Sequence, residues 1–156
     1  MKQASISSSQ TPIFTFGYQA LTLREFLSVL SRNGVKRIID IRFNPISRKP
    51  GFSKKALCSG ARKIGIDYIH MGQLGIDGKK RKNLKTENDY NILLDEYETS
   101  LDNGLAVAVE QAAILACETP SVLICYESDS NMCHRSRLAK ILNKKFQFQT
   151  EHLQVR

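Results

Sequence analysis

The hydrophobic pattern of the chain switches between two periods, and the switches predict strands and helices in turn. Short apolar runs bounded by polar or turn residues are typical of buried strands, whereas apolar residues three and four apart are typical of amphipathic helices. The predicted strands are 13–16, 35–43, 68–71, 122–126 and 149–154. The predicted helices are 22–33, 53–64, 106–117, one that begins at 86 and one that follows Cys133.

Capping residues mark the ends of several predicted helices. Thr22 is followed three residues later by Glu25, which together predict a capping box. Ser53 and Thr86 are expected to cap the next two helices in the same way, and Asn33-Gly34 provides a stop signal. Residues 72–85 are rich in glycine and lysine, and we expect a mobile loop there.

This alternation of strands and helices predicts a single three-layer α/β domain over residues 13–156. Its sheet should be mostly parallel, with helices on both faces. Residues 1–12 are rich in serine and glutamine and are predicted to be a flexible tail, without the apolar core of a secretory signal. In such folds ligands bind beyond the carboxyl ends of the strands.

Bulk composition narrows the class of protein. The chain has 156 residues, of which 42% are hydrophobic and 24% charged, as in ordinary globular domains. It has no apolar run of the roughly 20 residues that span a bilayer, so no membrane association is expected. The cysteines at 58, 117, 125 and 133 form no CxxC pair. This favours a reduced, cytoplasmic protein over one built on disulfides.

Charge is divided unevenly along the chain. The net charge is +8, but residues 1–85 hold 17 Lys and Arg against 4 Asp and Glu, while residues 86–156 are acidic overall. The basic half ends in the run Lys79-Lys80-Arg81-Lys82. Such a distribution suits a phosphate-bearing partner, nucleic acid among them, although a charge run alone is more often only a solvated surface. The alternative is that these side chains are only a solvated surface.

Polar residues recur at the predicted carboxyl ends of four strands. Gly17-Tyr18, Asp40, Arg42, His70 and Glu127 all occupy such positions, and we expect them to share one rim. Asp40 and Arg42 lie two residues apart and would point to the same face of a strand. They are candidates for the site, with a structural ion pair as the alternative.

The turn after residue 43 offers further groups for binding an anion. Ser47 and Arg48 follow Asn44-Pro45, and a hydroxyl beside a guanidinium suits a phosphate group. We therefore assign Gly17, Tyr18, Arg42, Ser47, Arg48, His70 and Arg135 to substrate binding.

Cys133, His134 and Arg135 stand where a strand-to-helix loop enters its helix. Cations are unfavourable at this positive end of a helix unless an anion binds there. A thiol in this position is partly thiolate at neutral pH and can act as a nucleophile; the alternative is a small buried side chain. The candidate catalytic residues are Asp40, Glu127, Cys133 and His134.

Metal binding is a third possibility, because the rim holds several possible ligands. These are Cys125, Glu127, Cys133, His134, His70 and Asp40. No pair has the spacing of a known zinc motif, so the sequence assigns no metal. It also lacks a glycine-rich nucleotide loop, and no cofactor is assigned.

These motifs together resemble the family of domains of unknown function numbered 488. The resemblance extends from about residue 13 to 152. It is carried by 14–18, 39–42, Pro45, 47–48, Phe52, 65–70, 74–75, 125–127 and 133–135. Where that family often has Gly-His-Ser after the first strand, this chain has Gly17-Tyr18-Gln19. The resemblance implies a compact α/β domain with a polar rim, but no particular reaction.

Three classes of function compete. The leading hypothesis is an enzyme that acts on a nucleotide or nucleic-acid substrate, since a pure phosphate binder gains nothing from carboxylates that repel its ligand. The alternatives are a non-catalytic module that binds phosphate or nucleic acid, and an interaction protein whose polar cluster is structural. The sequence does not indicate an oligomeric state.

Overall fold

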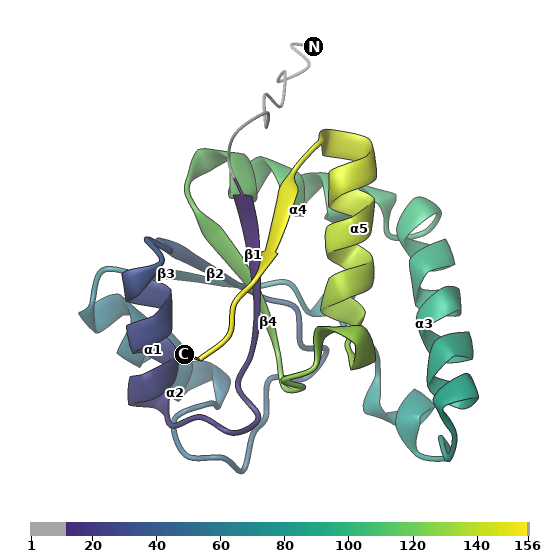
Figure 1. Ribbon diagram of the computed structural model, residues 1–156, viewed down its shortest axis with the longest axis horizontal. Helices are drawn as coiled ribbons and strands as arrows, with labels where there is room; N and C mark the ends of the chain where they lie inside the picture. Colours follow the sequence, from purple (N-terminus) through teal and green to yellow (C-terminus); the bar gives the residue numbers. More distant parts are fainter. Residues whose placement is uncertain (1–11, 156) are drawn as a thin grey trace.

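The computed structural model describes residues 12–155 as a five-stranded sheet with helices on both faces (Figure 1). All the strands are parallel, in the order β3-β2-β4-β1-β5. They are β1 (Pro12–Gly17), β2 (Arg37–Asp40), β3 (Asp67–His70), β4 (Ser121–Cys125) and β5 (Gln149–His152). The predicted single α/β domain is confirmed. Most of the predicted tail lies outside the described residues; Pro12 belongs to β1.

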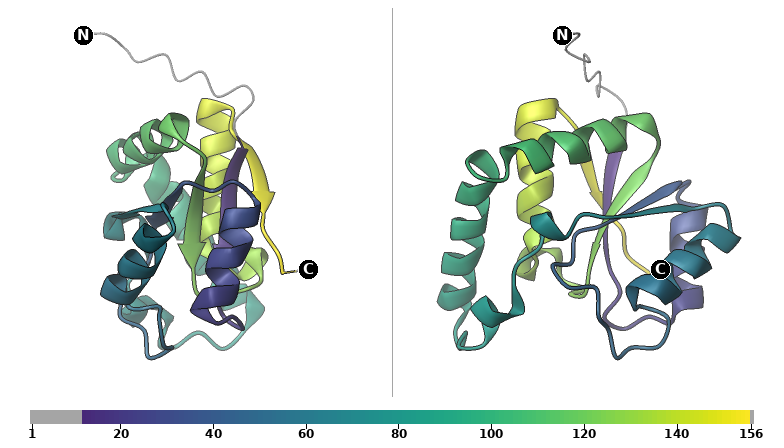
Figure 2. Two further views of the ribbon diagram at one scale, coloured as in Figure 1. Left: turned by 90° about the vertical axis from the view of Figure 1, so that its left-hand side faces the viewer. Right: turned by 180° about the vertical axis from the view of Figure 1, so that it is seen from behind.

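The helices divide between the two faces of the sheet (Figure 2). One face is covered by α1 (Leu23–Arg32) and α2 (Lys54–Lys63), and the other by α4 (Ala106–Glu118) and α5 (His134–Phe146). On this second side α3 (Glu87–Asp102) packs against α5 and α4. Three 3-10 turns complete the elements, namely η1 (Gly72–Leu74), η2 (Gly78–Arg81) and η3 (Ser130–Met132). Within residues 12–155, no helix has the length and hydrophobicity to cross a membrane.

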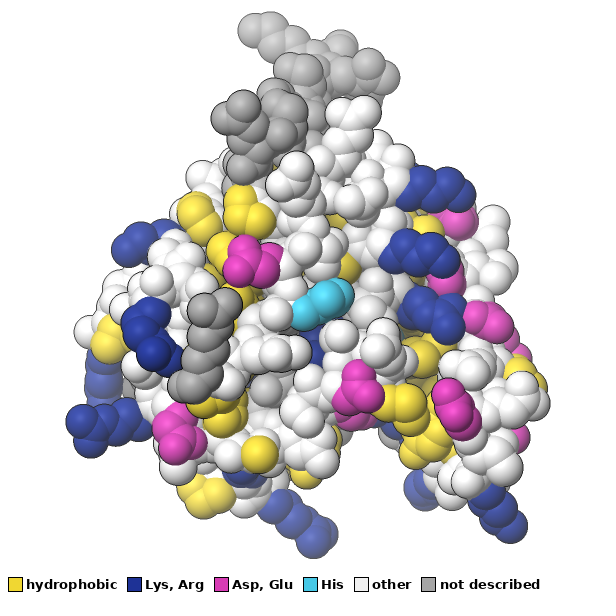
Figure 3. All heavy atoms as spheres, in the orientation of Figure 1, with side chains coloured by type: hydrophobic (Ala, Val, Ile, Leu, Met, Phe, Trp, Pro, Cys, Tyr) yellow, Lys and Arg dark blue, Asp and Glu magenta, His cyan; other side chains and the backbone are white. Residues whose placement is uncertain are grey.

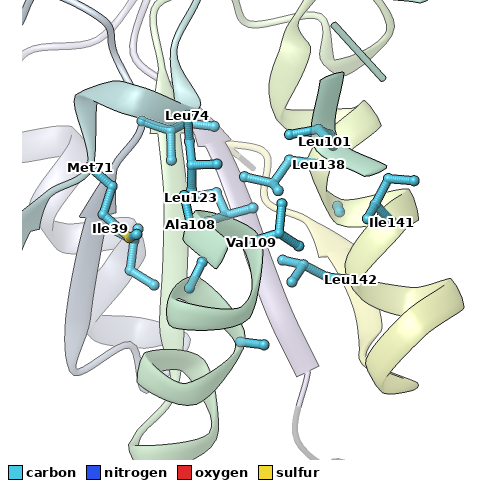
Figure 4. Close-up of a cluster of buried hydrophobic side chains, with 14 of the residues drawn as sticks. Ile39, Met71, Leu74, Leu101, Ala108, Val109, Leu123, Leu138, Ile141 and Leu142 are labelled. Atoms are coloured by element: carbon cyan, nitrogen blue, oxygen red, sulfur yellow. The ribbon is translucent and has the colours of Figure 1, made fainter. Parts of the chain in front are cut away.

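Alternation along the strands supplies two hydrophobic cores. Ile38 and Val122 point toward α1 and α2, while Ile39 and Leu123 point toward α4 and α5. Figure 4 shows the second of these clusters, in which Leu123 lies near Val109 of α4 and Ile39 lies beside Met71. Each fully buried aliphatic side chain stabilises the fold by about 1.5–3 kcal/mol. The two cores hold the carboxyl ends of the central strands in fixed positions.

The predicted caps are confirmed. Thr22 and Glu25 form a capping box at the start of α1, and Thr86 forms another with Asp89 at α3. Ser53 caps α2, because its side chain accepts a hydrogen bond from a backbone N–H in the first turn. Strands β3 and β4 begin and end one residue before their predicted limits.

Strand β5 ends at His152 instead of residue 154, and two other predicted segments differ more from the structure. Strand β2 ends at Asp40 instead of residue 43, because the backbone N–H of Arg42 donates to the Asp40 carboxylate at 3.1 Å and not to a neighbouring strand. The segment 72–85 was predicted to be a mobile loop, but it contains η1 and η2. Leu74 and Ile76 of this segment are buried in the core beside α3.

Candidate functional site

A polar hollow of about 350 Å³ lies at the carboxyl ends of β1, β2 and β4; we call it the cleft. The helix that follows β1 packs on one face of the sheet and the helix that follows β4 on the other, so a crevice opens between these neighbouring strands. The cleft is lined by Tyr18, Arg42, Phe43, Asn44, Ile46, Ser47, Arg48, Ile76, Gly78, Arg81, Cys125, Tyr126, Glu127 and His134. Six of the eleven predicted site residues therefore reach one hollow.

Asp40 lies beneath the cleft and has no exposed surface. Its carboxylate accepts two hydrogen bonds from Arg42, at 2.9 and 2.7 Å, and a third from the hydroxyl of Tyr68. Burial opposes the charge of Arg42, but the bonds and charge of Asp40 outweigh it and raise the arginine's pKa. Burial and the Asp40 carboxylate both raise the pKa of Tyr68. Asp40 and Arg42 thus form an ion pair, and a catalytic role for Asp40 stays a prediction.

The ion pair with Asp40 fixes the orientation of the Arg42 guanidinium, which makes further hydrogen bonds through its third nitrogen. With two donors held by Asp40, the remaining Nη1 donates to the carbonyl of Phe52 at 2.6 Å and to the hydroxyl of Tyr18 at 3.1 Å. The rings of Tyr18 and Phe52 stack at 4.3 Å. Tyr18 thus stands after β1 at the position where the family often has a histidine, and it lines the cleft.

The cleft also holds an ion pair with a histidine beside it. Arg81 donates to Oε1 of Glu127 at 2.8 Å, and its second terminal nitrogen is 3.4 Å from Nδ1 of His134. The other carboxylate oxygen of Glu127, Oε2, is buried and has no hydrogen-bond partner within the described residues. Sequence reasoning placed Arg81 only in a basic run. No local signal distinguishes it from the lysines on either side.

His134 is neutral and has a defined tautomer. Its Nε2 is 3.0 Å from the carbonyl of Ile41, so this nitrogen carries the proton and Nδ1 keeps a lone pair. Burial lowers the pKa of His134 to about 4, and the positive charges of Arg81 and Arg135 act in the same direction. The ring also packs edge-on against Tyr97 of α3.

Cys133 caps α5 and is joined to Cys125 by a disulfide. The expectation that all cysteines are reduced is wrong for this pair, because the end of β4 and the start of α5 bring two thiols together that stand eight residues apart. Cys58 and Cys117 are free. A nucleophilic Cys133 therefore stays a prediction for the reduced protein.

Arg135 points into the protein and not toward the cleft. Its guanidinium donates to the Cys125 sulfur at 2.9 Å, to Ser128 O at 3.2 Å and to the carbonyl of Glu127. Only 1% of the residue is exposed, and burial lowers its pKa to about 10 although Glu127 and Asp129 partly offset this. The cation at the helix start is therefore satisfied by loop carbonyls.

The remaining predicted residues lie around the cleft. Gly17 packs so closely against the Glu127 carbonyl that an added Cβ would lie 1.8 Å from its oxygen. His70 donates to the carbonyl of Arg42 at 2.8 Å, and this bond holds the backbone of a residue that lines the cleft. Ser47 accepts a hydrogen bond from the backbone N–H of Lys49, while Arg48 is exposed.

Basic side chains also surround the strand ends. In Figure 3, Lys and Arg side chains project from the lower edge of the molecule, which is the edge where β1 and β4 end in Figure 1. Lys79, Lys80 and Lys82 are exposed beside Gly78 and Arg81 of the cleft. Positive charge beside the cleft favours an anionic ligand.

Fold and cleft together define a parallel α/β domain with a polar crevice at its carboxyl edge. The sequence profile of the family described as "Domain of unknown function DUF488" matches residues 22–142. The chain belongs to this family, as the sequence resemblance indicated. Neither curated proteins nor solved structures include a significant match to the chain.

Proposed function

We propose that the protein is an enzyme that acts on a nucleotide or nucleic-acid substrate bound in the cleft. The observation that carries this proposal is Glu127, whose Oε2 is buried at the cleft wall without a hydrogen-bond partner among the described residues. A buried, unpaired carboxylate oxygen costs about 1–3 kcal/mol or more, and such a group calls for a functional explanation. A substrate hydroxyl, amine or water that donates to Oε2 would supply the missing partner, and Glu127 would accept its proton.

Two arginines support the assignment of a phosphate group. Arg48 is exposed at the mouth of the cleft and Arg81 lies deeper, beside Glu127. A guanidinium binds phosphate oxygens through parallel hydrogen bonds, so these side chains can fix a phosphate while Glu127 faces the reacting atom.

Exposed apolar rings support the assignment of a base. Phe43 and Tyr126 line the cleft and are 48% and 46% exposed, although aromatic residues of this size are usually buried. Base stacking on aromatic side chains contributes about 1–3 kcal/mol per base. Rings and arginines in one hollow match the two chemical parts of a nucleotide.

Binding tests the substrate class. A 5′-phosphorylated single-stranded oligonucleotide should bind, and Arg48→Ala should weaken its affinity about tenfold or more, since hydrogen bonds to charged groups contribute about 1.5–3 kcal/mol. Arg62→Ala is the matched control, because Arg62 is exposed on α2 and outside the cleft. Equal losses in the two variants would contradict a phosphate site in the cleft.

Turnover separates an enzyme from the alternative, a module that only binds. Glu127→Gln keeps the shape of the side chain but removes the charge and the proton acceptor. Incubation with nucleotides and oligonucleotides, followed by mass spectrometry, should detect a product for the wild type and none for this variant. Binding without any product from the wild type would favour the binding module, for which the basic surroundings of the cleft also argue.

Salt dependence tests the contribution of the basic run. Replacing Lys79, Lys80 and Lys82 together by alanine should reduce the slope of log affinity against log salt by up to about 3 for duplex DNA. The matched control replaces the lysines of α2 at 54, 55 and 63. A slope that changes only in the control would contradict the placement of nucleic acid at the cleft.

A further inference from the structure

Three possible metal ligands converge at the floor of the cleft. The sulfurs of Cys125 and Cys133 and a carboxylate oxygen of Glu127 all lie within 4.8 Å of one another. The sulfurs are buried, and the carboxylate has one oxygen without a hydrogen bond. We propose that the reduced form of this protein binds a zinc-type divalent ion through Cys125, Cys133 and Glu127.

The backbone spacing suits two thiolates on one ion. The Cα atoms of Cys125 and Cys133 are 7.3 Å apart, whereas most disulfides have Cα atoms about 4.4–6.8 Å apart. Thiolates bound to one tetrahedral zinc at about 2.3 Å each have their sulfurs roughly 3.8 Å apart. The end of β4 and the start of α5 therefore leave room for the wider arrangement without moving either element.

His134 lies beside these three ligands, although its nitrogens are not among the atoms that lie within 4.8 Å of one another. Its Nδ1 is 3.7 Å from the Cys133 sulfur and carries the lone pair, because Nε2 donates to the carbonyl of Ile41. Zinc-bound histidines almost always donate their other ring nitrogen to a carbonyl or carboxylate. The hydrogen bond from Nε2 of His134 to the carbonyl of Ile41 is a bond of this kind.

Charges near the ligands are compatible with a divalent cation. Two thiolates and one carboxylate carry three negative charges, so a divalent ion leaves one in excess. Arg81, which donates to Oε1 of Glu127 at 2.8 Å, offsets this remaining negative charge. Arg135 also donates to the Cys125 sulfur at 2.9 Å. Soft thiolate ligands favour zinc over magnesium or calcium.

Metal binding requires reduction of the disulfide first. A dithiol reductant supplies two electrons and two protons to the sulfurs and is itself oxidised to a disulfide. Both thiol protons are then released as the ion binds to the thiolates. The disulfide and the metal-bound state thus exclude each other, and oxidation would release the ion.

Cobalt provides a direct readout that needs no substrate. The full-length protein, reduced and then freed of reductant without oxygen, should bind one equivalent of Co²⁺. Binding should give the thiolate-to-cobalt charge-transfer band and the visible bands of a tetrahedral ion, and Zn²⁺ should displace the cobalt. The oxidised protein should give neither signal, because disulfide sulfurs are not ligands of this type. A reduced wild type without the charge-transfer band would overturn the proposal.

Variants locate the ligands. Cys125→Ser and Cys133→Ser should each lower the affinity for Co²⁺ more than about 100-fold, since second-shell changes alone cost about 10- to 100-fold. The control is Cys58→Ser combined with Cys117→Ser, which changes both free cysteines and should keep the band. Loss of the band in the control variant would place the metal elsewhere and refute the site.

This inference does not depend on the proposed function, although Glu127 takes part in both. Arg48→Ala should weaken oligonucleotide binding and leave Co²⁺ binding unchanged. A protein that binds oligonucleotides but no cobalt would refute the metal site alone; the reverse result would refute the proposed function alone.

Discussion

Removing the charge of Asp40 should destabilise the protein more than any other substitution of one carboxylate by its amide. Asp40 has no exposed surface, and its partner Arg42 is only 8% exposed. In Asp40→Asn the two hydrogen bonds from Arg42 cannot both be kept, since an amide nitrogen would face the guanidinium. The buried positive charge of Arg42 would then have no counter-charge in contact.

The expected cost follows from the burial of the pair. Removing one partner of a buried ion pair costs about 3–5 kcal/mol, because the other charge stays desolvated. For a domain of this size each kcal/mol lowers Tm by about 2–4 °C, so Asp40→Asn should lower it by about 10 °C. Urea denaturation monitored by circular dichroism would measure the free energy of unfolding directly.

Asp67 is a matched control, because it accepts a hydrogen bond from Arg37 at 3.0 Å but its side chain is 46% exposed. Asp67→Asn should cost no more than about 1 kcal/mol. Adding Arg42→Met to Asp40→Asn removes the uncompensated charge and should recover part of the lost stability. Similar free energies of unfolding for Asp40→Asn and Asp67→Asn would refute the reasoning from burial.

The remaining predictions concern the wall of the cleft. Burial lowers the pKa of His134 to about 4 in the folded protein. As pH falls below about 6.5, the imidazole therefore binds a proton in the unfolded chain before it does so in the folded protein. The wild type should therefore lose up to about 3 kcal/mol of stability between pH 6.5 and 4, and His134→Gln should lose clearly less in urea titrations at each pH. Equal pH dependence in the two proteins would contradict a buried neutral ring. Gly17→Ala should cost at least about 1–3 kcal/mol, since its Cβ would collide with the Glu127 carbonyl, whereas Gly104→Ala meets no atom within 4 Å and should be close to neutral. Thermal denaturation of both glycine variants would show the difference, and a stable Gly17→Ala would show that the β4 loop can move aside.

Local signals explain why the elements were predictable. The capping boxes at Thr22 and Thr86 each depend on residues three apart, and the apolar periods of β4 and α1 are contained within single segments. The rim was predictable for the same kind of reason, because parallel strands place all of their carboxyl ends at one edge. From this rule alone, Tyr18, Arg42 and Glu127 were expected to meet.

Which side chains face the cleft was decided only by tertiary packing. Arg81 meets Glu127 across 46 positions of sequence, and its contact depends on how η2 lies over the end of β4. Arg135 turns inward because the carbonyls of the β4 loop surround its guanidinium, and no spacing in the sequence indicates that direction.

The sequence by itself thus determined the parallel α/β fold, the helix ends and the edge of the sheet where polar groups collect, since each follows from residues close together in the chain. Only the tertiary structure decided that Asp40 is buried against Arg42 and that Cys133 lies against Cys125. Which side chains are buried and which of them pair depends on how the helices and loops are oriented over the sheet. These orientations are set by the packing of the two cores and not by any local pattern.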